Sequence, residues 1–289
     1  MNNKETFGVT TAPHIRGSLT TGSVMYAVIL ALLPAALYGI SRIGAHALLI
    51  ILTSVLTAML TEYALDCFLG RGNTLRDGSA ALTGLLLALT LPGDVPLYIP
   101  FAGALIAAAG VKGLFGGLGK NLLNPALAAR CLLTMAFREQ MAAKAAAAGD
   151  SAAAVLKALV YHPAGYIGGS ALALLAGGLF LLAIRGVTWH IPVSVLGSFA
   201  VFTLLFGGGE GPVLSQMAGG VVLAAFFMAT DPVTSPVSGR GQLVYGVLIG
   251  VLTALFQRFL STAEAVCLGV LLANAAVPVI DRRIIPAAR

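Results

Sequence analysis

The feature that most constrains this chain is a series of ten apolar runs that are nearly free of charge. They occupy residues 24–40, 43–60, 79–91, 95–111, 122–137, 164–184, 191–206, 213–230, 243–256 and 265–280. Charged residues make up only 10% of the 289 residues, whereas a soluble domain carries about 25%. One water-soluble core of this size cannot hide so much apolar surface. The sequence therefore predicts an all-α integral membrane protein with ten transmembrane helices and excludes an ordinary soluble enzyme.

The basic residues are spread along the chain. The net charge is +6, yet no basic run or aromatic-interleaved basic patch occurs, so we expect no nucleic-acid partner. Positive residues that flank the runs orient a membrane protein, since they favour the cytoplasmic side. Counted over alternating loops, they place a segment 1–23 and a tail 282–289 in the cytoplasm and the connection 138–163 on the outer face.

A weak internal repeat divides the chain. The pattern T-x-P-x-x-x-P begins at Thr90 and again at Thr230, each time at the end of an apolar run. The runs before and after it also recur at about the same offset, which indicates two five-helix repeats at 24–137 and 164–281. Because five is odd, the second repeat must be inverted, and interrupted helices should meet near the membrane midplane. We expect broken third and eighth helices, and a further interruption in the short run 243–256.

The two T-x-P patterns have two interpretations. In one, proline stops the helix and threonine bonds to a freed carbonyl, as often happens in membranes. In the other, hydroxyls and helix ends hold a polar ligand, and Asp231 favours this because a carboxylate beside a span is costly unless it faces a cavity or a cation. Thr234 and Ser235 add hydroxyls in the same stretch.

A glycine-rich stretch at 112–121 precedes the fifth run. It lacks the G-K-[S/T] ending of a phosphate-binding loop, so a tight turn is the better interpretation. Asn121 and Asn124 open the fifth run and Arg130 lies inside it, a set of groups that could hydrogen-bond a flat heterocycle. Alternatively, Arg130 snorkels to the membrane surface or pairs with Glu62 or Asp66.

Recognised catalytic or metal-binding patterns do not occur. No HExxH, GxSxG or paired carboxylates with catalytic spacing are present, so we expect no complete active site and no metal centre in this chain alone. Its three cysteines are far apart in sequence and its four histidines are isolated, which argues against zinc, iron–sulfur and haem sites.

Several motifs in order along the chain carry a resemblance to a known family. They read A-P-H-I-R at 12–16, D-G-S at 77–79, T-G-L-L-L-A-L-T-L-P at 83–92, L-F-G-G-L-G at 114–119, N-P-A at 124–126 and F-F-M-A-T-D-P-V-T-S-P at 226–236. Together they resemble the D subunits of the Rnf ion-translocating electron transport complexes, the RnfD/NqrB family. The similarity covers nearly the whole chain.

This resemblance implies a bacterial or archaeal inner-membrane subunit of a six-subunit Rnf complex. Such complexes couple electron flow between ferredoxin and NAD to transport of sodium ions or protons. The family also implies flavin: FMN attached to a threonine in an outer-face S-G-A-T motif, and a riboflavin-like flavin within the membrane. Its fold resembles the inverted repeats of urea and ammonium channels.

One departure from the family concerns the attached FMN. The threonine acceptor is absent from the connection 138–163, where Ser151 is only a weak candidate. We therefore predict that any flavin in this chain is non-covalent. The leading hypothesis is an electron-transfer subunit; the alternatives are a channel for a small solute, and a scaffold without cofactor.

Overall fold

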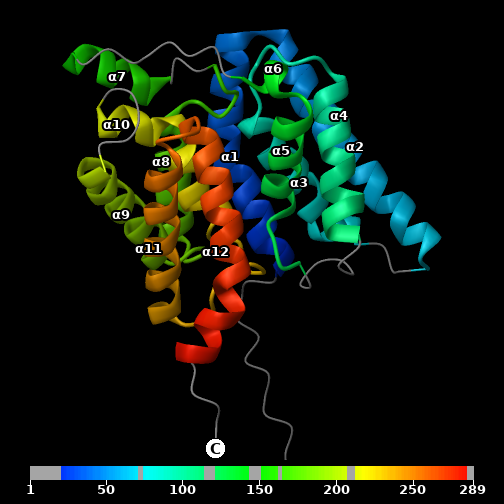
Figure 1. Ribbon diagram of the computed structural model, residues 1–289. Helices are drawn as coiled ribbons and strands as arrows, with labels where there is room; N and C mark the ends of the chain where they lie inside the picture. Colours follow the sequence, from blue (N-terminus) through cyan, green and yellow to red (C-terminus); the bar gives the residue numbers. More distant parts are fainter. Residues whose placement is uncertain are drawn as a thin grey trace, which may run out of the picture.

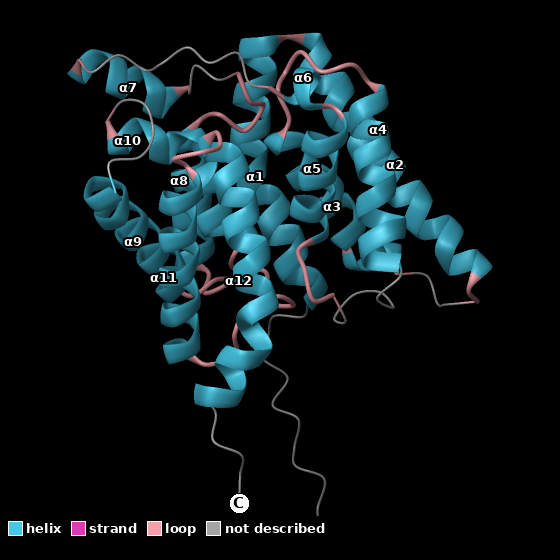
Figure 2. Cartoon of the chain, viewed as in Figure 1, coloured by secondary structure: helices cyan, strands magenta, loops and turns pink. Residues whose placement is uncertain are grey.

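The computed structural model describes residues 21–70, 74–113, 121–142, 151–161, 165–206 and 212–284, and this part of the chain is overwhelmingly helical (Figures 1 and 2). Four of its helices are long and apolar enough to cross a membrane. They are α1 (Thr21–Ile43), α2 (Ala45–Phe68), α11 (Gly239–Phe256) and α12 (Thr262–Ile284). Shorter apolar helices accompany them: α3 (Ser79–Thr90), α4 (Tyr98–Leu105), α5 (Pro125–Ala136), α8 (Ala171–Ala183) and α9 (His190–Phe206). The prediction of an all-helical membrane protein is confirmed at this level.

Wide π-helical turns occur in two places. They are η2 (Ile106–Gly113), which continues α4, and the pair η3 (Met217–Val221) and η4 (Ala224–Met228), which follows α10 (Val213–Gln216). Such turns are rare in proteins, and those that occur are often found at functional sites. The remaining short elements are η1 (Leu75–Asp77), α6 (Arg138–Met141) and α7 (Ala152–Val160). The connection predicted as an outer-face loop therefore contains two short helices.

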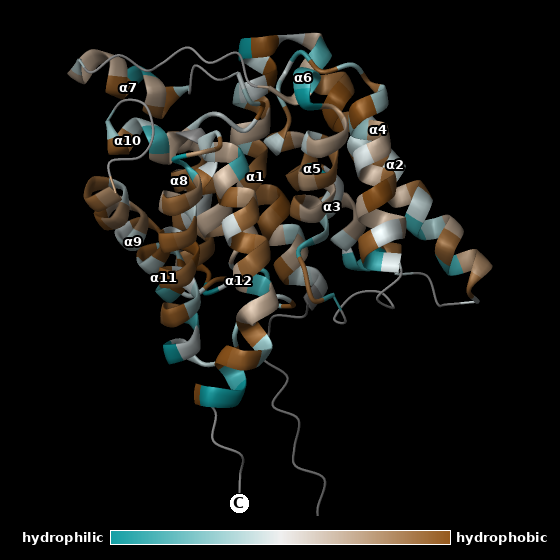
Figure 3. Cartoon of the chain, in the orientation of Figure 1, coloured by the Kyte–Doolittle hydropathy of each residue, from teal (hydrophilic) through white to brown (hydrophobic). Residues whose placement is uncertain are grey.

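Hydrophobic residues predominate along most of the helices (Figure 3), and many large apolar side chains are exposed. Leu37, Leu60, Leu204 and Leu205 are each more than 60% exposed. In water such a surface would drive aggregation, whereas lipid tails solvate it without cost. The distribution of hydropathy thus agrees with a multi-pass membrane protein.

Two helix boundaries differ from those expected from charge-free runs. Helix α2 continues past residue 60 and includes Glu62 and Asp66, because both carboxylates have partners inside the protein. Helix α11 begins at Gly239 and is unbroken, so the interruption predicted in 243–256 is wrong. Its extra N-terminal residues are polar, and Ser238 caps them by accepting a bond from the Gly241 amide at 3.1 Å.

The third helix ends where the T-x-P pattern predicted. Helix α3 stops at Thr90, and Leu91 is extended. The following stretch pairs with residues 165–168: the Gly168 amide donates to the Leu89 carbonyl at 2.9 Å, and the Ile167 amide to the Leu91 carbonyl at 3.1 Å. For this reason the helix predicted from residue 164 starts only at α8, after residues 165–170 have run as non-helical chain.

Helices from the two halves of the chain pack against each other. Helix α1 lies against α8, and α5 against α12. A Cβ atom at Gly177 of α8 would lie 2.1 Å from the Ala31 carbonyl oxygen of α1, so this contact requires a residue without a side chain. The start of α1 and the end of α12 lie at one end of the molecule, called here the terminal side; α6 and α7 lie at the other, called the opposite side (Figure 1).

Candidate functional site

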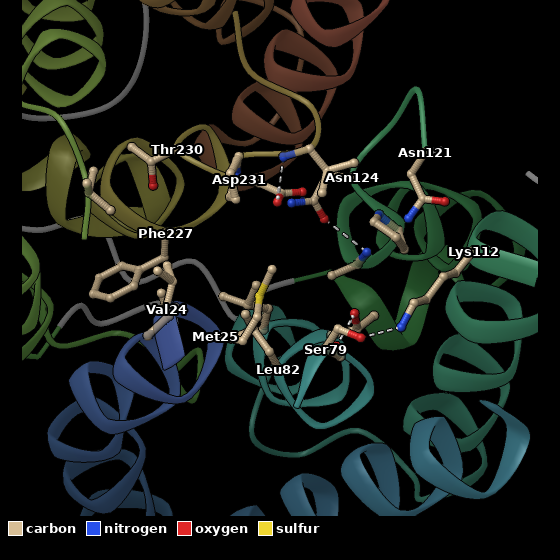
Figure 4. A pocket seen from close by; sticks show the side chains of 18 of the residues that line it. Val24, Met25, Ser79, Leu82, Lys112, Asn121, Asn124, Phe227, Thr230 and Asp231 are labelled. Atoms are coloured by element: carbon tan, nitrogen blue, oxygen red, sulfur yellow. Dashed lines mark hydrogen bonds between the residues drawn. The ribbon is translucent and has the colours of Figure 1, made fainter. Parts of the chain in front are cut away.

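A cavity with both apolar and polar lining residues lies among helix ends near the terminal side, and we call it the Asp231 cavity (Figure 4). Its open volume is about 60 Å³, room for a few water molecules or an ion. The wall is formed by the start of α1, the start of α3, the end of η2, the segment that enters α5, and the segment that leaves η4. Its polar lining residues are Ser79, Thr83, Lys112, Asn121, Asn124, Thr230 and Asp231.

Asp231 lies in the turn that follows η4. Its carboxylate accepts long hydrogen bonds from the Val233 amide at 3.3 Å and the Thr234 hydroxyl at 3.4 Å. Its carbonyl accepts from the Thr234 and Ser235 amides, so these residues shape the turn. Thr234 and Ser235 do not themselves line the cavity. Within the described residues, no cation lies at ion-pair distance from Asp231.

Two asparagines contribute amide groups to the same cavity. The Asn124 side-chain oxygen caps α5 by accepting from the amides of Ala126 and Leu127 at 3.0 and 3.3 Å. Its Nδ2 donates to the Met228 carbonyl at 3.3 Å, which ties α5 to the end of η4. Asn121 is buried, and its Oδ1 has no hydrogen-bond partner among the described residues. A buried acceptor without a partner is costly, so it is available to a ligand or water.

The threonines of both T-x-P patterns bond to their own helices. The Thr90 hydroxyl donates to the Leu87 carbonyl at 2.6 Å, and the Thr230 hydroxyl to the Phe226 carbonyl at 2.7 Å. Both hydroxyl protons are thus donated to carbonyls of the helix that ends there, as the helix-stop interpretation predicts. Thr230 still lines the cavity, where its oxygen can accept a bond.

A buried network around Lys112 was not predicted. The Lys112 ammonium lies 2.5 Å from the Glu62 carboxylate and 2.6 Å from the Ser79 hydroxyl. The Thr74 hydroxyl joins Glu62 to Asp66, at 2.6 and 2.7 Å. A signal existed in the sequence: Glu62 and Asp66 are four residues apart, on one face of a helix, in a chain where charges are scarce.

Arg130 lies in a second cavity of about 30 Å³, which we call the Arg130 cavity. Its guanidinium carbon is 5.1 Å from the centre of the Tyr166 ring, and its Nε has no hydrogen-bond partner among the described residues. At 2% exposure Arg130 does not snorkel, and the predicted pairing with Glu62 or Asp66 is wrong because those carboxylates are bonded elsewhere. The structure separates Arg130 from the asparagine pair that it was expected to join.

Comparisons with known proteins match almost the whole chain. Residues 8–289 fit the model of the NQR2, RnfD, RnfE family. The chain belongs to this family. It is 36% identical to the D subunit of the proton-translocating ferredoxin:NAD(+) oxidoreductase complex of Clostridium ljungdahlii, with 96% of this chain and 95% of the relative covered. It is also 36% identical to the D subunit of the Na(+)-translocating complex of Acetobacterium woodii (95% and 92% covered). Identity is 34% to the D subunit of the ion-translocating oxidoreductase complex of Shewanella amazonensis (98% and 97% covered).

Ser151 lies apart from both cavities, at the start of α7 on the opposite side (Figure 1). The residue is exposed, and its hydroxyl oxygen caps α7 by accepting from the Ala154 amide at 3.2 Å. The predicted N-terminal segment up to residue 20, the glycine-rich turn at 114–120, residues 143–150 before Ser151 and the tail from 285 lie outside the described residues.

Proposed function

We propose that this chain is a membrane subunit of an ion-translocating ferredoxin:NAD oxidoreductase complex, in which it relays electrons through bound flavin and couples their flow to sodium or proton transport. The observation that carries the proposal is the full-length similarity to relatives that bear this name. This similarity makes the chain part of an oxidoreductase and translocase. The alternative, a small-solute channel, has no support among these relatives.

The proposed architecture consists of two inverted five-helix repeats. Two packing contacts support it, because α1 with α8 and α5 with α12 are the pairs that an in-plane two-fold axis would relate. The two helix breaks also support it. Thr90 lies near the pairing with residues 165–168, whereas Thr230 lies with the start of α1 at the terminal side. We further propose cytoplasmic termini, an inner-membrane location and a six-subunit Rnf complex.

The Asp231 cavity fits a flavin in the chemistry of its groups. The ring edge of a flavin carries an N–H and carbonyl oxygens; Asn121 offers an unpartnered acceptor, and Asn124 and Thr230 are close by. These residues would hold the ring, which supplies one- and two-electron redox chemistry when bound. An open volume of about 60 Å³ is below the roughly 300–1,000 Å³ of ligand pockets, so Met25 and Phe227 would have to repack.

Asp231 suits the cation that such a complex transports. Asp231 is only partly exposed, and no cation among the described residues lies at ion-pair distance from it. Such a carboxylate favours taking up either a sodium ion or a proton. Asn124 is hydrogen-bonded to the Met228 carbonyl, three residues before Asp231. A ligand that moves Asn124 would therefore also move the turn that carries Asp231.

In the Arg130 cavity, the guanidinium would face an electron-rich group, such as a flavin carbonyl.

The proposal is tested by Asp231→Ala in the complex in membrane vesicles. Ferredoxin-driven NAD reduction should lose its coupling to sodium uptake or proton uptake while the complex still assembles. Glu139→Gln is the matched control, because it removes an exposed carboxylate on α6. Full coupling at normal assembly in Asp231→Ala would refute the role of Asp231. Flavin absorbance in the purified complex tests the cofactor separately, since a colourless chain would refute electron transfer through bound flavin.

A further inference from the structure

Lys112 belongs both to a buried ion pair and to the wall of the Asp231 cavity. It lies at the end of η2, and its ammonium is bonded to Glu62 and Ser79. The same side chain lines the cavity that contains Asp231, and Figure 4 shows it on the wall across from the Asp231 turn. Thus one buried ammonium adjoins one carboxylate and shares a cavity with another.

The charges of this group do not balance. If all are ionised, Lys112 carries one positive charge against the negative charges of Glu62 and Asp231. Two further carboxylates adjoin this group: Asp66 shares the Thr74 hydroxyl with Glu62, and Asp77 accepts from the Ser79 hydroxyl. Glu62 is neutralised by Lys112, whereas the Asp231 carboxylate accepts two long hydrogen bonds in its turn and has no ion-pair partner in the part of the chain that the structure describes. In surroundings of low polarity an unneutralised carboxylate attracts a cation strongly. The cavity therefore has room, and charge, for one further cation.

We propose that Lys112 is a tethered cation that exchanges between Glu62 and Asp231, and that the carboxylate it leaves is the site of the transported cation. This inference rests on the proposed function, which it deepens. In the arrangement described here, Lys112 is paired with Glu62, and the Asp231 carboxylate can bind the transported cation. Movement of the ammonium to Asp231 displaces that cation and opens Glu62, which retains its bond from the Thr74 hydroxyl.

The lysine side chain suits this task. Its four methylene groups are flexible, and its compact ammonium can change partner without the paired geometry that an arginine requires. Gly113 follows it on the π-helical turn. A sodium ion and a proton would compete with the ammonium in the same way, because each neutralises a carboxylate.

The test uses the complex in membrane vesicles with Lys112→Gln. NAD reduction is measured over a series of sodium concentrations and pH values, together with sodium uptake and vesicle acidification. Without the competing ammonium, the half-saturating concentration of the coupling cation should fall roughly 5- to 150-fold, the usual range of coupling between two sites. Cation transported per electron should fall as well, because release is impaired. Lys157→Gln, at an exposed lysine of α7, is the control.

A double variant, Glu62→Gln with Lys112→Gln, separates exchange from simple charge neutralisation. If Lys112 only neutralises Glu62, removing both should restore the original cation dependence, and that result would overturn the proposal. If Lys112 exchanges between the two carboxylates, the half-saturating concentration of the coupling cation should stay low in the double variant. An unchanged cation dependence in Lys112→Gln would also overturn it. Loss of coupling in Asp231→Ala alongside either result would leave the proposed function intact and reject only the exchange.

Discussion

The two helix breaks carry the same T-x-P pattern but are stabilised in different ways. At the Thr90 break, the carbonyls of Leu89 and Leu91 accept bonds from the backbone amides of residues 168 and 167. At the Thr230 break, the Met228 carbonyl accepts from the Asn124 side chain, and the Asp231 carboxylate accepts from the Val233 amide in the turn that follows. The first break is thus held by backbone pairing between two distant segments. The second break depends on side chains, which can also bind a ligand.

The cavities beside the two breaks differ in charge. The Arg130 cavity contains a buried cation that stacks on an aromatic ring, and its volume is about 30 Å³. The Asp231 cavity, at about 60 Å³, is lined by a carboxylate, two side-chain amides and Lys112. Two breaks with the same sequence pattern therefore adjoin one cavity that contains a buried guanidinium and another that contains a carboxylate.

The largest expected effect tests the backbone pairing of the first break. A Cβ atom at Gly168 would lie 2.8 Å from the Leu89 carbonyl oxygen. Gly168→Ala must therefore separate the paired backbones, and we expect it to lower the free energy of unfolding by about 1–3 kcal/mol. Thermal unfolding of the detergent-purified protein measures this. Gly197→Ala is the control, because nothing lies within 4 Å of its Cβ position; equal stability of the two variants would contradict the backbone account.

Helix positions could be predicted from the sequence because apolar runs report burial in lipid or core. The ends of the helices could not be predicted in this way. A charged residue ends an apolar run, but the helix continues through that residue when its charge has a partner. The partner of Glu62 is Lys112, 50 residues away. Likewise, the non-helical course of residues 165–170 depends on pairing with a distant helix end.

The candidate site was predictable in part. Asn121, Asn124, Thr230 and Asp231 were expected together, and they line one cavity. Each polar residue beside an apolar run is conspicuous, and the repeat indicated where the halves meet. Arg130 was misplaced because sequence spacing puts it two helical turns from the asparagines, while the opposing Tyr166 that holds it comes from the other half.

A smaller effect compares the two threonines directly. Thr90→Val and Thr230→Val each remove one side-chain bond to a carbonyl, so both should cost a similar free energy of unfolding, about 1 kcal/mol. Only Thr230 lines the Asp231 cavity, and only Thr230→Val should change the half-saturating concentration of the coupling cation. Titration of NAD reduction with sodium and with acid measures this. The same shift in Thr90→Val would show that the breaks are functionally equivalent.

The smallest expected effect concerns how a flavin is held on the opposite side. Family resemblance implies a phosphoester to threonine there, and Ser151 offers a hydroxyl on an exposed helix start, with Asp150 before it and three alanines after it. An attaching enzyme that reads several residues around its acceptor would not find the family pattern.

We therefore predict that the denatured chain shows no flavin fluorescence and that the peptide 141–157 has its unmodified mass. Ser151→Ala should leave the flavin content of the complex unchanged and only weaken the cap of α7, by about 1 kcal/mol. A peptide heavier by one FMN in the parent chain, and unmodified in Ser151→Ala, would instead show that serine replaces the family threonine and that both sides of the molecule hold redox groups.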